Sequence, residues 1–139
     1  MELAVDDGRV YGIKRVLQKR RSKGYGKNSA LMHCLRQQLE EYFSGRRKKF
    51  NLPLVKRRTA FQQKVWKAMA AIPYGQMKSY GYIAQKVGHP RAARAVGGAC
   101  GFNPWLVVIP CHRIVAADGG LGGFALGLAA KKKLLEIEQ

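Results

Sequence analysis

The sequence contains few acidic residues, few cysteines and no long hydrophobic run. No apolar stretch approaches the ~18 residues that a membrane-spanning helix requires, so an integral membrane protein is not expected. Only three cysteines are present, and the first seven residues have the character of neither a signal peptide nor a transit peptide. These absences together predict a protein of a reduced, intracellular compartment.

Three further absences narrow the function. No repeat occurs at a period of about 20 to 50 residues, which argues against a solenoid. The sequence has neither a phosphate-binding P-loop nor the glycine fingerprint of a dinucleotide site. Its three histidines and three cysteines lack zinc spacing such as Cys-x-x-Cys. We therefore expect no metal site and no bound nucleotide cofactor.

What the sequence does contain is positive charge. It has 26 Lys and Arg residues against 8 Asp and Glu, a formal net charge of +18 in 139 residues. Each basic cluster alone is typical of a solvated face, and Lys131-Lys132-Lys133 suits the second half of a helix. The sum requires a polyanionic partner, and nucleic acid is the commonest one inside cells. An anionic membrane surface is the rival, but it would favour a basic amphipathic helix that we do not find.

The length and the 47% hydrophobic content predict one folded domain, or one domain with a small appendage. In the first part, two short apolar runs flank Asp6-Asp7-Gly8, which is typical of a β-hairpin with a tight turn. The basic stretch 14–27 is expected to be a connector. Apolar residues at helical spacing then predict a helix over 29–43, with Ser29 as its N-cap and Ser44-Gly45 at its end.

The second part starts near Thr59, which can cap a helix over 60–72. Ser79 can cap a shorter helix, and a third is predicted over 91–100. The run 106–109 has the character of a buried strand, 119–123 reads as a glycine-rich loop, and the chain closes with a helix over 127–138. The residues expected in the core of these helices are Phe61, Val65, Trp66, Met69, Tyr82, Ile83, Val87, Leu128, Leu134, Leu135 and Ile137.

Two short helices around Gly88-His89-Pro90 suggest a helix-turn-helix, and an ordinary helical hairpin is the alternative that spacing leaves open. The second helix is unusual, because alanines and glycines leave it almost without side chains apart from Arg94. Its successive glycines, Gly97 and Gly98, each cost about 1 kcal/mol relative to alanine. Close approach of a neighbour is the expected reason, and that neighbour is either another element of the fold or the wall of a DNA groove.

The segment Pro110-Cys111-His112-Arg113 carries the best candidate for chemistry. The thiolate is the nucleophilic form of cysteine; neighbouring cations favour it, and an imidazole can accept its proton. Adjacent residues in a strand face opposite ways, so His112 can serve Cys111 only from a turn or through water, and the preceding proline favours a turn. A buried structural cysteine is the alternative. For Cys34 and Cys100, on predicted helices, we expect that packing role.

Several segments of the second part occur together and in a particular order. They are Ile72-Pro73-Tyr74-Gly75, Ser79-Tyr80-Gly81-Tyr82-Ile83-Ala84, Ala92-Ala93-Arg94-Ala95-Val96-Gly97-Gly98-Ala99, Asn103-Pro104, Ile109-Pro110-Cys111-His112-Arg113-Ile114-Val115, and Leu134-Leu135 with Glu138. This combination resembles the O6-alkylguanine-DNA alkyltransferase family. The resemblance is close over 59–139, and a looser likeness reaches back to the helix around 39–43.

The resemblance implies a DNA repair protein that acts once. Members of the family bind the minor groove through a helix-turn-helix, flip the alkylated nucleotide out of the duplex and move its alkyl group irreversibly to the motif cysteine. The implied substrate is O6-alkylguanine, with O4-alkylthymine left open, and no cofactor is implied. The implied partner is double-stranded DNA carrying alkylated guanine. We expect a monomer with no membrane partner, in the cytoplasm with the DNA or in a eukaryotic nucleus.

The resemblance also implies roles for individual residues. Cys111 is the nucleophile; His112, Glu138 and a bridging water form a proton relay; Asn103 braces the turns of the site. Tyr80 helps to rotate the nucleotide, and Arg94 fills its place in the base stack. The other residues expected to contact DNA are Ala92, Ala93, Ala95, Gly97 and Gly98. The expected substrate pocket comprises Tyr80, Ile114, Phe124, Ala125 and Leu126, with the backbone carbonyls of Cys111 and Ile114 facing the guanine amino group.

The sequence departs from the family pattern in two places. In the loop before the last helix, Phe124 replaces a common tyrosine, Ala125 a frequent serine and Leu126 a frequent glycine. The region before Thr59 is shorter than the usual N-terminal domain, and a zinc site there is not supported. The expected fold class is therefore α/β (α+β): a reduced cap with a basic linker over 1–56, and a mainly helical, winged-helix-like domain over 57–139.

Two other functions compete with alkyl transfer. One is a non-catalytic, alkyltransferase-like protein that flips and binds the lesion; that class lacks the motif cysteine, whereas Cys111 is present. The other is a helix-turn-helix regulator that uses Cys111 as a redox switch. Such a regulator would bind one DNA sequence and lose affinity on oxidation.

Overall fold

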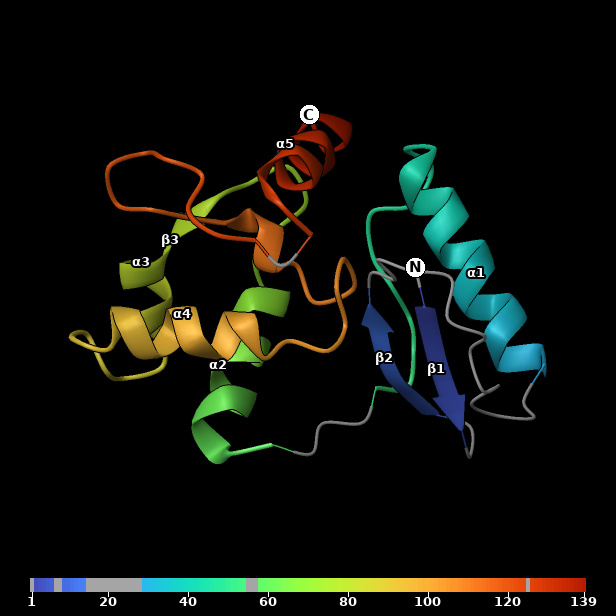
Figure 1. Cartoon of the computed structure of the whole chain (residues 1–139), viewed down its shortest axis with the longest axis horizontal. Helices are drawn as coiled ribbons and strands as arrows, with labels where there is room; N and C mark the ends of the chain where they lie inside the picture. Colours follow the sequence, from blue (N-terminus) through green and yellow to red (C-terminus); the bar gives the residue numbers. More distant parts are fainter. Residues whose placement is uncertain (1, 7–8, 15–28, 55–57, 125) are drawn as a thin grey trace. The chain divides into compact units, whose positions relative to one another are not determined.

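The computed structural model of the chain describes residues 2–6, 9–14, 29–54, 58–124 and 126–139 (Figure 1). These residues fall into two compact units. The first comprises 1–56 with 104–106, and the second comprises 57–103 with 107–139. The fold is mixed and mainly helical, with two small sheets of two strands each among the described residues. No described helix has the length and apolar character to cross a membrane.

The first unit contains a hairpin and one helix. Strands β1 (Glu2–Asp6) and β2 (Arg9–Lys14) pair antiparallel, which confirms the predicted hairpin, although its turn at 7–8 lies outside the described residues, as does most of the predicted connector. Helix α1 (Ser29–Phe43) has the predicted bounds, but Ser29 is its first helical residue rather than its N-cap. Leu35, Leu39 and Tyr42 are buried on one side of the helix, as the apolar spacing predicts.

The second unit begins with α2 (Ala60–Ala70). Thr59 caps it as predicted: its hydroxyl accepts from the Gln62 backbone N–H, and the Gln62 side chain accepts from the Thr59 N–H. Short strand β3 (Lys78–Ser79) leads into α3 (Tyr80–Lys86), for which Ser79 is the N-cap. Helix α4 (Ala93–Gly101) follows, and α2, α3 and α4 all contact one another.

The rest of this unit carries the site. A single 3₁₀ turn, η1 (Cys111–Arg113), runs into β4 (Ile114–Val115), which pairs in parallel with β3. The chain then passes through the glycine-rich loop to α5 (Leu128–Ile137). The side chains that form the core of this unit are Val65, Trp66, Met69, Ile72, Ile83, Ala84, Val96, Ala99, Val107, Ile109, Ile114, Leu134 and Leu135.

The prediction of a strand over 106–109 is wrong, because the chain forms turns there. The run is bracketed by Pro104 and Pro110, and the Ile109 carbonyl accepts from the Asn103 side chain at 2.9 Å instead of from a neighbouring strand. Val107 has a φ of +74°, a conformation that is strained for a β-branched residue. A short apolar run between two prolines is thus buried by a folded loop, and hydrophobicity alone could not distinguish this from a strand.

Several predicted core positions are less buried than expected. Leu128, at the first residue of α5, is 54% exposed. Phe61, Tyr82, Val87 and Ile137 are only partly buried. In each case the residue has helical spacing but lies near a helix end or at the edge of the apolar stripe, where the packing is incomplete.

Candidate active site

The Cys111 side chain lies at the start of η1, which is a turn and not a continuation of a strand. The Arg113 N–H donates to the Pro110 carbonyl at 3.0 Å and closes the turn. Cys111 is only 7% exposed, and His112 is completely buried. The prediction that these neighbours are presented from a turn is therefore confirmed.

His112 is fixed by Glu138, the C-cap residue of α5. The His112 Nε2 lies 2.8 Å from the Glu138 Oε1, and both side chains are buried. Because a carboxylate can only accept, Nε2 carries the hydrogen, and the lone pair of a neutral imidazole is then on Nδ1. Burial lowers the pKa of His112, and the adjacent Glu138 only partly offsets this. The ring is therefore a neutral base at physiological pH.

Arg113 holds the same carboxylate with two parallel hydrogen bonds. Its Nε donates to Glu138 Oε2 at 2.9 Å, and its Nη2 donates to Oε1 at 2.8 Å. Its remaining Nη1 donates to the Ile72 carbonyl at 2.7 Å. Such a bidentate pair is geometrically rigid, so it fixes the direction of the Glu138 carboxylate. The sequence identified Arg113 as part of the motif but indicated no role for it.

The turn around Gly75 closes over the end of α5. The Gly75 N–H donates to Glu138 Oε2 at 3.4 Å, and the Tyr74 hydroxyl donates to the Ile137 carbonyl at 3.0 Å. Gly75 has a φ of +80°, and a Cβ built on it would lie 2.9 Å from the Glu138 carbonyl oxygen. Only glycine fits this approach, which explains the Pro-Tyr-Gly segment by packing against the site.

Asn103 joins the end of α4 to the turn before Cys111. Its Nδ2 donates to the Ile109 carbonyl at 2.9 Å, and its side chain also hydrogen-bonds Cys111. This bond and the nearby Lys131 ammonium stabilise the thiolate, yet burial is the larger effect and raises the pKa of Cys111 overall. Cys111 therefore carries a neutral thiol in this environment.

Lys131 is the residue beside the site whose burial the sequence pattern concealed most fully. It belongs to a run of three lysines that is typical of a solvated face, but its side chain is completely buried. Its Nζ donates to the Ile114 and Leu121 carbonyls and, at 3.4 Å, to the Gly123 carbonyl. A signal was present: Lys131, Leu134, Leu135 and Glu138 share one helical face. The ammonium thus ties β4 to the glycine-rich loop.

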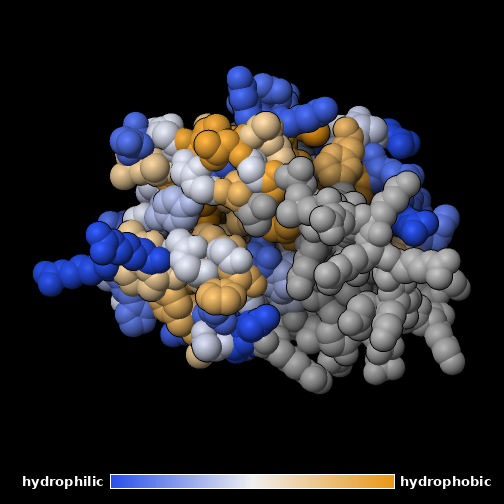
Figure 2. Space-filling model, in the orientation of Figure 1, coloured by the Kyte–Doolittle hydropathy of each residue, from blue (hydrophilic) through white to orange (hydrophobic). Residues whose placement is uncertain are grey.

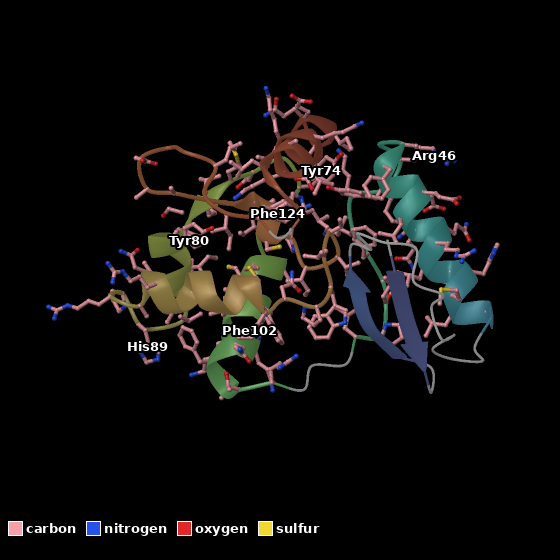
Figure 3. The ribbon with its side chains drawn as sticks, in the orientation of Figure 1. Arg46, Tyr74, Tyr80, His89, Phe102 and Phe124 are labelled. Atoms are coloured by element: carbon pink, nitrogen blue, oxygen red, sulfur yellow. The ribbon has the colours of Figure 1, made fainter. Side chains whose placement is uncertain are left out.

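Tyr80 lies at the first residue of α3, between α4 and the glycine-rich loop (Figure 3). A Cβ on Gly97 would be 3.9 Å from the Tyr80 ring, and one on Gly122 would be 3.1 Å from its hydroxyl. Burial and the nearby thiols of Cys100 and Cys111 raise the pKa of Tyr80. Tyr80 therefore lies beside Gly97 of α4 and Gly122 of the loop.

Helix α4 exposes a face that is almost bare. Arg94, Ala95 and Gly98 are exposed, whereas Ala92, Ala93 and Gly97 are half-buried. Gly97 packs near Tyr80, but a Cβ on Gly98 would meet nothing within 4 Å. The two glycines predicted a closely approaching neighbour. For Gly97 that neighbour is Tyr80, within the fold, whereas none is found for Gly98 among the described residues. In Figure 2 a strongly hydrophilic side chain reaches outward where the turn between α3 and α4 lies in Figure 1.

Two of the remaining predicted pocket residues, Ile114 and Phe124, lie near the same turn. The Ile114 carbonyl accepts from Lys131, and the Phe124 ring lies 6.4 Å from the His112 ring (Figure 3). Leu126 is half-buried, and Ala125 lies outside the described residues. Cys34 and Cys100 are half-buried; Cys100 contacts the Met69 sulfur, and burial raises its pKa to about 12. In the described part of the chain, no three His, Cys, Asp or Glu side chains gather as metal ligands.

Comparison with known proteins gives a consistent result. Residues 60–139 match the sequence model of the 6-O-methylguanine DNA methyltransferase, DNA binding domain. The chain is 50% identical over 102 residues to methylated-DNA–protein-cysteine methyltransferases of Mycobacterium bovis and Methanosarcina barkeri. Each alignment covers 73% of this chain, but only 62% and 65% of those relatives. The chain thus spans less than two thirds of their length.

Solved structures extend the likeness to the fold. The crystal structure of Mycobacterium tuberculosis OGT in complex with DNA matches with a TM-score of 0.88 and 40% identity, covering 98% of this chain and 84% of that one. A Schizosaccharomyces pombe Atl1 structure, in complex with damaged DNA containing O6-carboxymethylguanine, matches with a TM-score of 0.53 and 36% identity. That second match covers 59% of this chain and 78% of the other.

Proposed function

Because the chain belongs to the 6-O-methylguanine DNA methyltransferase family, we propose that it repairs DNA by moving an alkyl group from O6-alkylguanine to Cys111. The transfer is irreversible and occurs once per molecule, without a cofactor. The observation that carries this proposal is the buried constellation of Cys111, His112, Glu138 and Asn103. O4-alkylthymine, with a similarly placed alkyl oxygen, is a second substrate to test.

The geometry of the turn supports a mechanism in which Cys111 loses its proton to His112 and attacks the alkyl carbon. The Cys111 thiol gives its proton through a bridging water to Nδ1 of His112, while Glu138 stabilises the imidazolium that forms. The sulfur attacks the alkyl carbon, a C–S bond forms and the bond from that carbon to O6 breaks. The guanine, which stays in the DNA, is the leaving group and takes up a proton in place of the alkyl group, while His112 returns the thiol proton through water. Because no step removes the alkyl group from sulfur, the protein is consumed.

Arg113 and Lys131 are positioning residues in this scheme. Arg113 orients the Glu138 carboxylate, and Lys131 joins β4 to the glycine-rich loop through its bonds to backbone carbonyls. Ile114, Phe124, Ala125 and Leu126 are proposed to line the pocket for the flipped base. Leu126, which replaces a glycine that is frequent in the family, would narrow this pocket.

DNA binding is proposed for the bare face of α4. Gly98 costs helix stability although a Cβ there would meet nothing within 4 Å, so we attribute this glycine to an external neighbour. A minor groove fits such a face, with α3 and α4 as a helix-turn-helix in a winged-helix-like domain, and 1–56 as a reduced α/β cap. Arg94 would replace the flipped base and Tyr80 would help to rotate it, because the O6 substituent is inaccessible within the duplex.

A lesion-binding protein without transfer activity is the second candidate, favoured by the likeness to S. pombe Atl1. The presence of Cys111 beside His112 and Glu138 argues against this candidate. A redox-sensing regulator is the third candidate. All three functions are compatible with a basic chain that binds double-stranded DNA as a monomer.

One experiment separates these functions. The protein is incubated with a duplex containing O6-methylguanine, and intact mass and peptide mass spectra are recorded. We expect one added methyl group on Cys111, with Cys34 and Cys100 unchanged. Cys100 and Cys111 share one tryptic peptide, so cleavage after Phe102 or Trp105 by chymotrypsin is needed to separate them. Tight binding of the lesion without a mass change would support the lesion-binding protein instead, and a methyl group elsewhere would refute the role of Cys111.

A further inference from the structure

The outward side of α3 carries two lysines arranged around one aromatic ring. The Lys78 Nζ lies 4.9 Å from the centroid of the Tyr82 ring, and the Lys86 Nζ lies 5.4 Å from it. Tyr82 and Lys86 are four residues apart on α3 and so share one side of the helix, and Lys78 reaches the same ring from β3. Tyr82 and Lys78 are half-buried and Lys86 is exposed. We call Lys78, Tyr82 and Lys86 the α3 stripe.

Two cations on one ring repel each other, so the arrangement favours an anion beside them. Each ammonium is attracted by the ring face, which limits the freedom that a surface lysine ordinarily has. The sequence has no Asp or Glu between Glu41 and Asp118. Among the described residues, the carboxylates that form ion pairs are those of Glu41 and Glu138, and neither pairs with the stripe. The positive charge of the stripe is thus left for an external partner.

The two cations and the contact between α3 and α4 favour one kind of anion. Tyr80 and Tyr82 are two residues apart on α3, about 200° around the helix, so the stripe does not include Tyr80 and lies outside the pocket that Tyr80 lines. Helix α3 also contacts α4, whose exposed face is the proposed groove-binding surface. A DNA strand presents a phosphate about every 3.4 Å along the axis. Two ammonium groups near one ring therefore suit neighbouring phosphates of a strand that passes α4.

We propose that the α3 stripe is a phosphate-binding site that holds the DNA backbone beside the groove occupied by α4. This inference rests on the proposed DNA-binding function and adds to it a site for which neither base reading nor alkyl transfer is needed. The two lysines supply the charge, and the Tyr82 ring sets their positions before DNA arrives. The site is independent of DNA sequence, because it contacts phosphates only.

The test measures how the DNA affinity depends on salt. The double variant Lys78→Gln/Lys86→Gln should lower the slope of log K against log salt by about 1.8, or 0.9 for each phosphate that is no longer neutralised. The ratio of wild-type to variant affinity should then fall about 12-fold between roughly 50 and 200 mM salt. Transfer from free O6-methylguanine base should be unchanged, because that substrate has no phosphate. The matched control is Lys132→Gln/Lys133→Gln, two exposed lysines of α5 with the same change in charge.

Two variants of Tyr82 test whether its aromatic ring positions the two lysines. Tyr82→Phe keeps a ring face and should bind DNA like the wild type, whereas Tyr82→Leu should bind about two- to fivefold more weakly at equal charge. A wild-type slope in the lysine double variant, or an equal reduction in the α5 control, would overturn the site while leaving DNA repair intact. If the wild type itself bound DNA without salt dependence, the proposed DNA-binding function would fail first, and the stripe with it.

Discussion

The second unit treats charge in two opposite ways. Around Cys111, the charged groups are buried and hydrogen-bonded: Arg113 pairs with Glu138, which also contacts the neutral His112, and Lys131 donates to backbone carbonyls. On α3 and α4, the basic side chains lie at the surface without a carboxylate partner among the described residues. Internal pairing fixes geometry, and external excess attracts a partner. The contrast separates the residues expected to act on chemistry from those expected to act on binding.

The largest expected effect removes chemistry and leaves binding intact. Cys111→Ser should abolish methyl transfer, since a hydroxyl at this position is a far weaker nucleophile than sulfur. Affinity for an O6-methylguanine duplex should stay within about twofold of the wild type, because the basic faces are untouched. Transfer is measured by intact mass and binding by fluorescence anisotropy. Residual transfer in this variant would show that another residue accepts the alkyl group.

The next largest effect breaks the buried charge pair. Glu138→Gln should lower the free energy of unfolding by about 3–5 kcal/mol, because Arg113 keeps a buried charge without its carboxylate. Lys132→Gln, at the exposed side of α5, should change it by less than about 0.5 kcal/mol. Urea denaturation at pH 7.5 measures both. Equal stability of the two variants would mean that the buried network does not hold the fold.

Arg94→Ala and Tyr80→Ala test the residues of α3 and α4 that are expected to act on binding rather than on chemistry. Both should slow repair of a duplex by roughly tenfold or more, since base flipping costs a few kcal/mol that these side chains help to offset. Reaction with free O6-methylguanine should fall much less, because nothing has to be flipped. Lys133→Ala is the control for the removal of one positive charge. Equal reductions on duplex and free base would assign the two residues to the pocket instead.

Leu126→Gly tests whether the pocket wall is narrow. A leucine facing the pocket would oppose a benzyl ring by about 1–3 kcal/mol, which corresponds to about 5- to 150-fold in rate. The variant should therefore improve reaction with O6-benzylguanine relative to O6-methylguanine. The ratio of the two second-order rates is measured, with circular dichroism as a check on folding. An unchanged ratio in a folded variant would place Leu126 outside the pocket.

The smallest expected effect concerns pH. Burial lowers the pKa of His112 in the folded protein, whereas in the unfolded chain it titrates near 6.5. Below that pH the unfolded chain therefore binds a proton that the folded protein does not, and stability falls toward the lowered native pKa by at most about 1.4 kcal/mol per pH unit. Urea denaturation between pH 7.5 and 5 should show this decrease. His112→Gln should flatten the profile and the exposed His33→Gln should not; the reverse result would assign the decrease elsewhere.

Local signals in the sequence predicted most of the helices, because caps and apolar spacing act within a few residues. Thr59 and Ser79 cap α2 and α3, as their positions predict. The fold around 106–109 could not be predicted this way, since a side chain from Asn103 and two prolines decide it. The resemblance to a family indicated His112 and Glu138, and the structure brings them together.

The positioning residues were harder to predict, because their partners are distant in the sequence. Arg113 reaches Glu138 and Ile72, and Lys131 reaches Ile114 and the loop carbonyls. A lysine in a run of three lysines has the composition of a solvated surface, and only its position on the Leu134 face of α5 distinguishes it. Burial of a charge depends on such long-range contacts, which no local pattern encodes.

The hydrogen bonds that hold Glu138 at the end of α5 have a consequence for local unfolding. The last turn of a helix ordinarily frays, so its amide hydrogens exchange with solvent quickly. Here Glu138 cannot swing outward without breaking two bonds to Arg113, one to His112 and one to the Gly75 backbone. Amide exchange in the final turn of α5 should therefore be as slow as in the core helices. Any opening that speeds it also removes the carboxylate from His112, so the exchange rate reports how often the relay is assembled, without substrate or DNA.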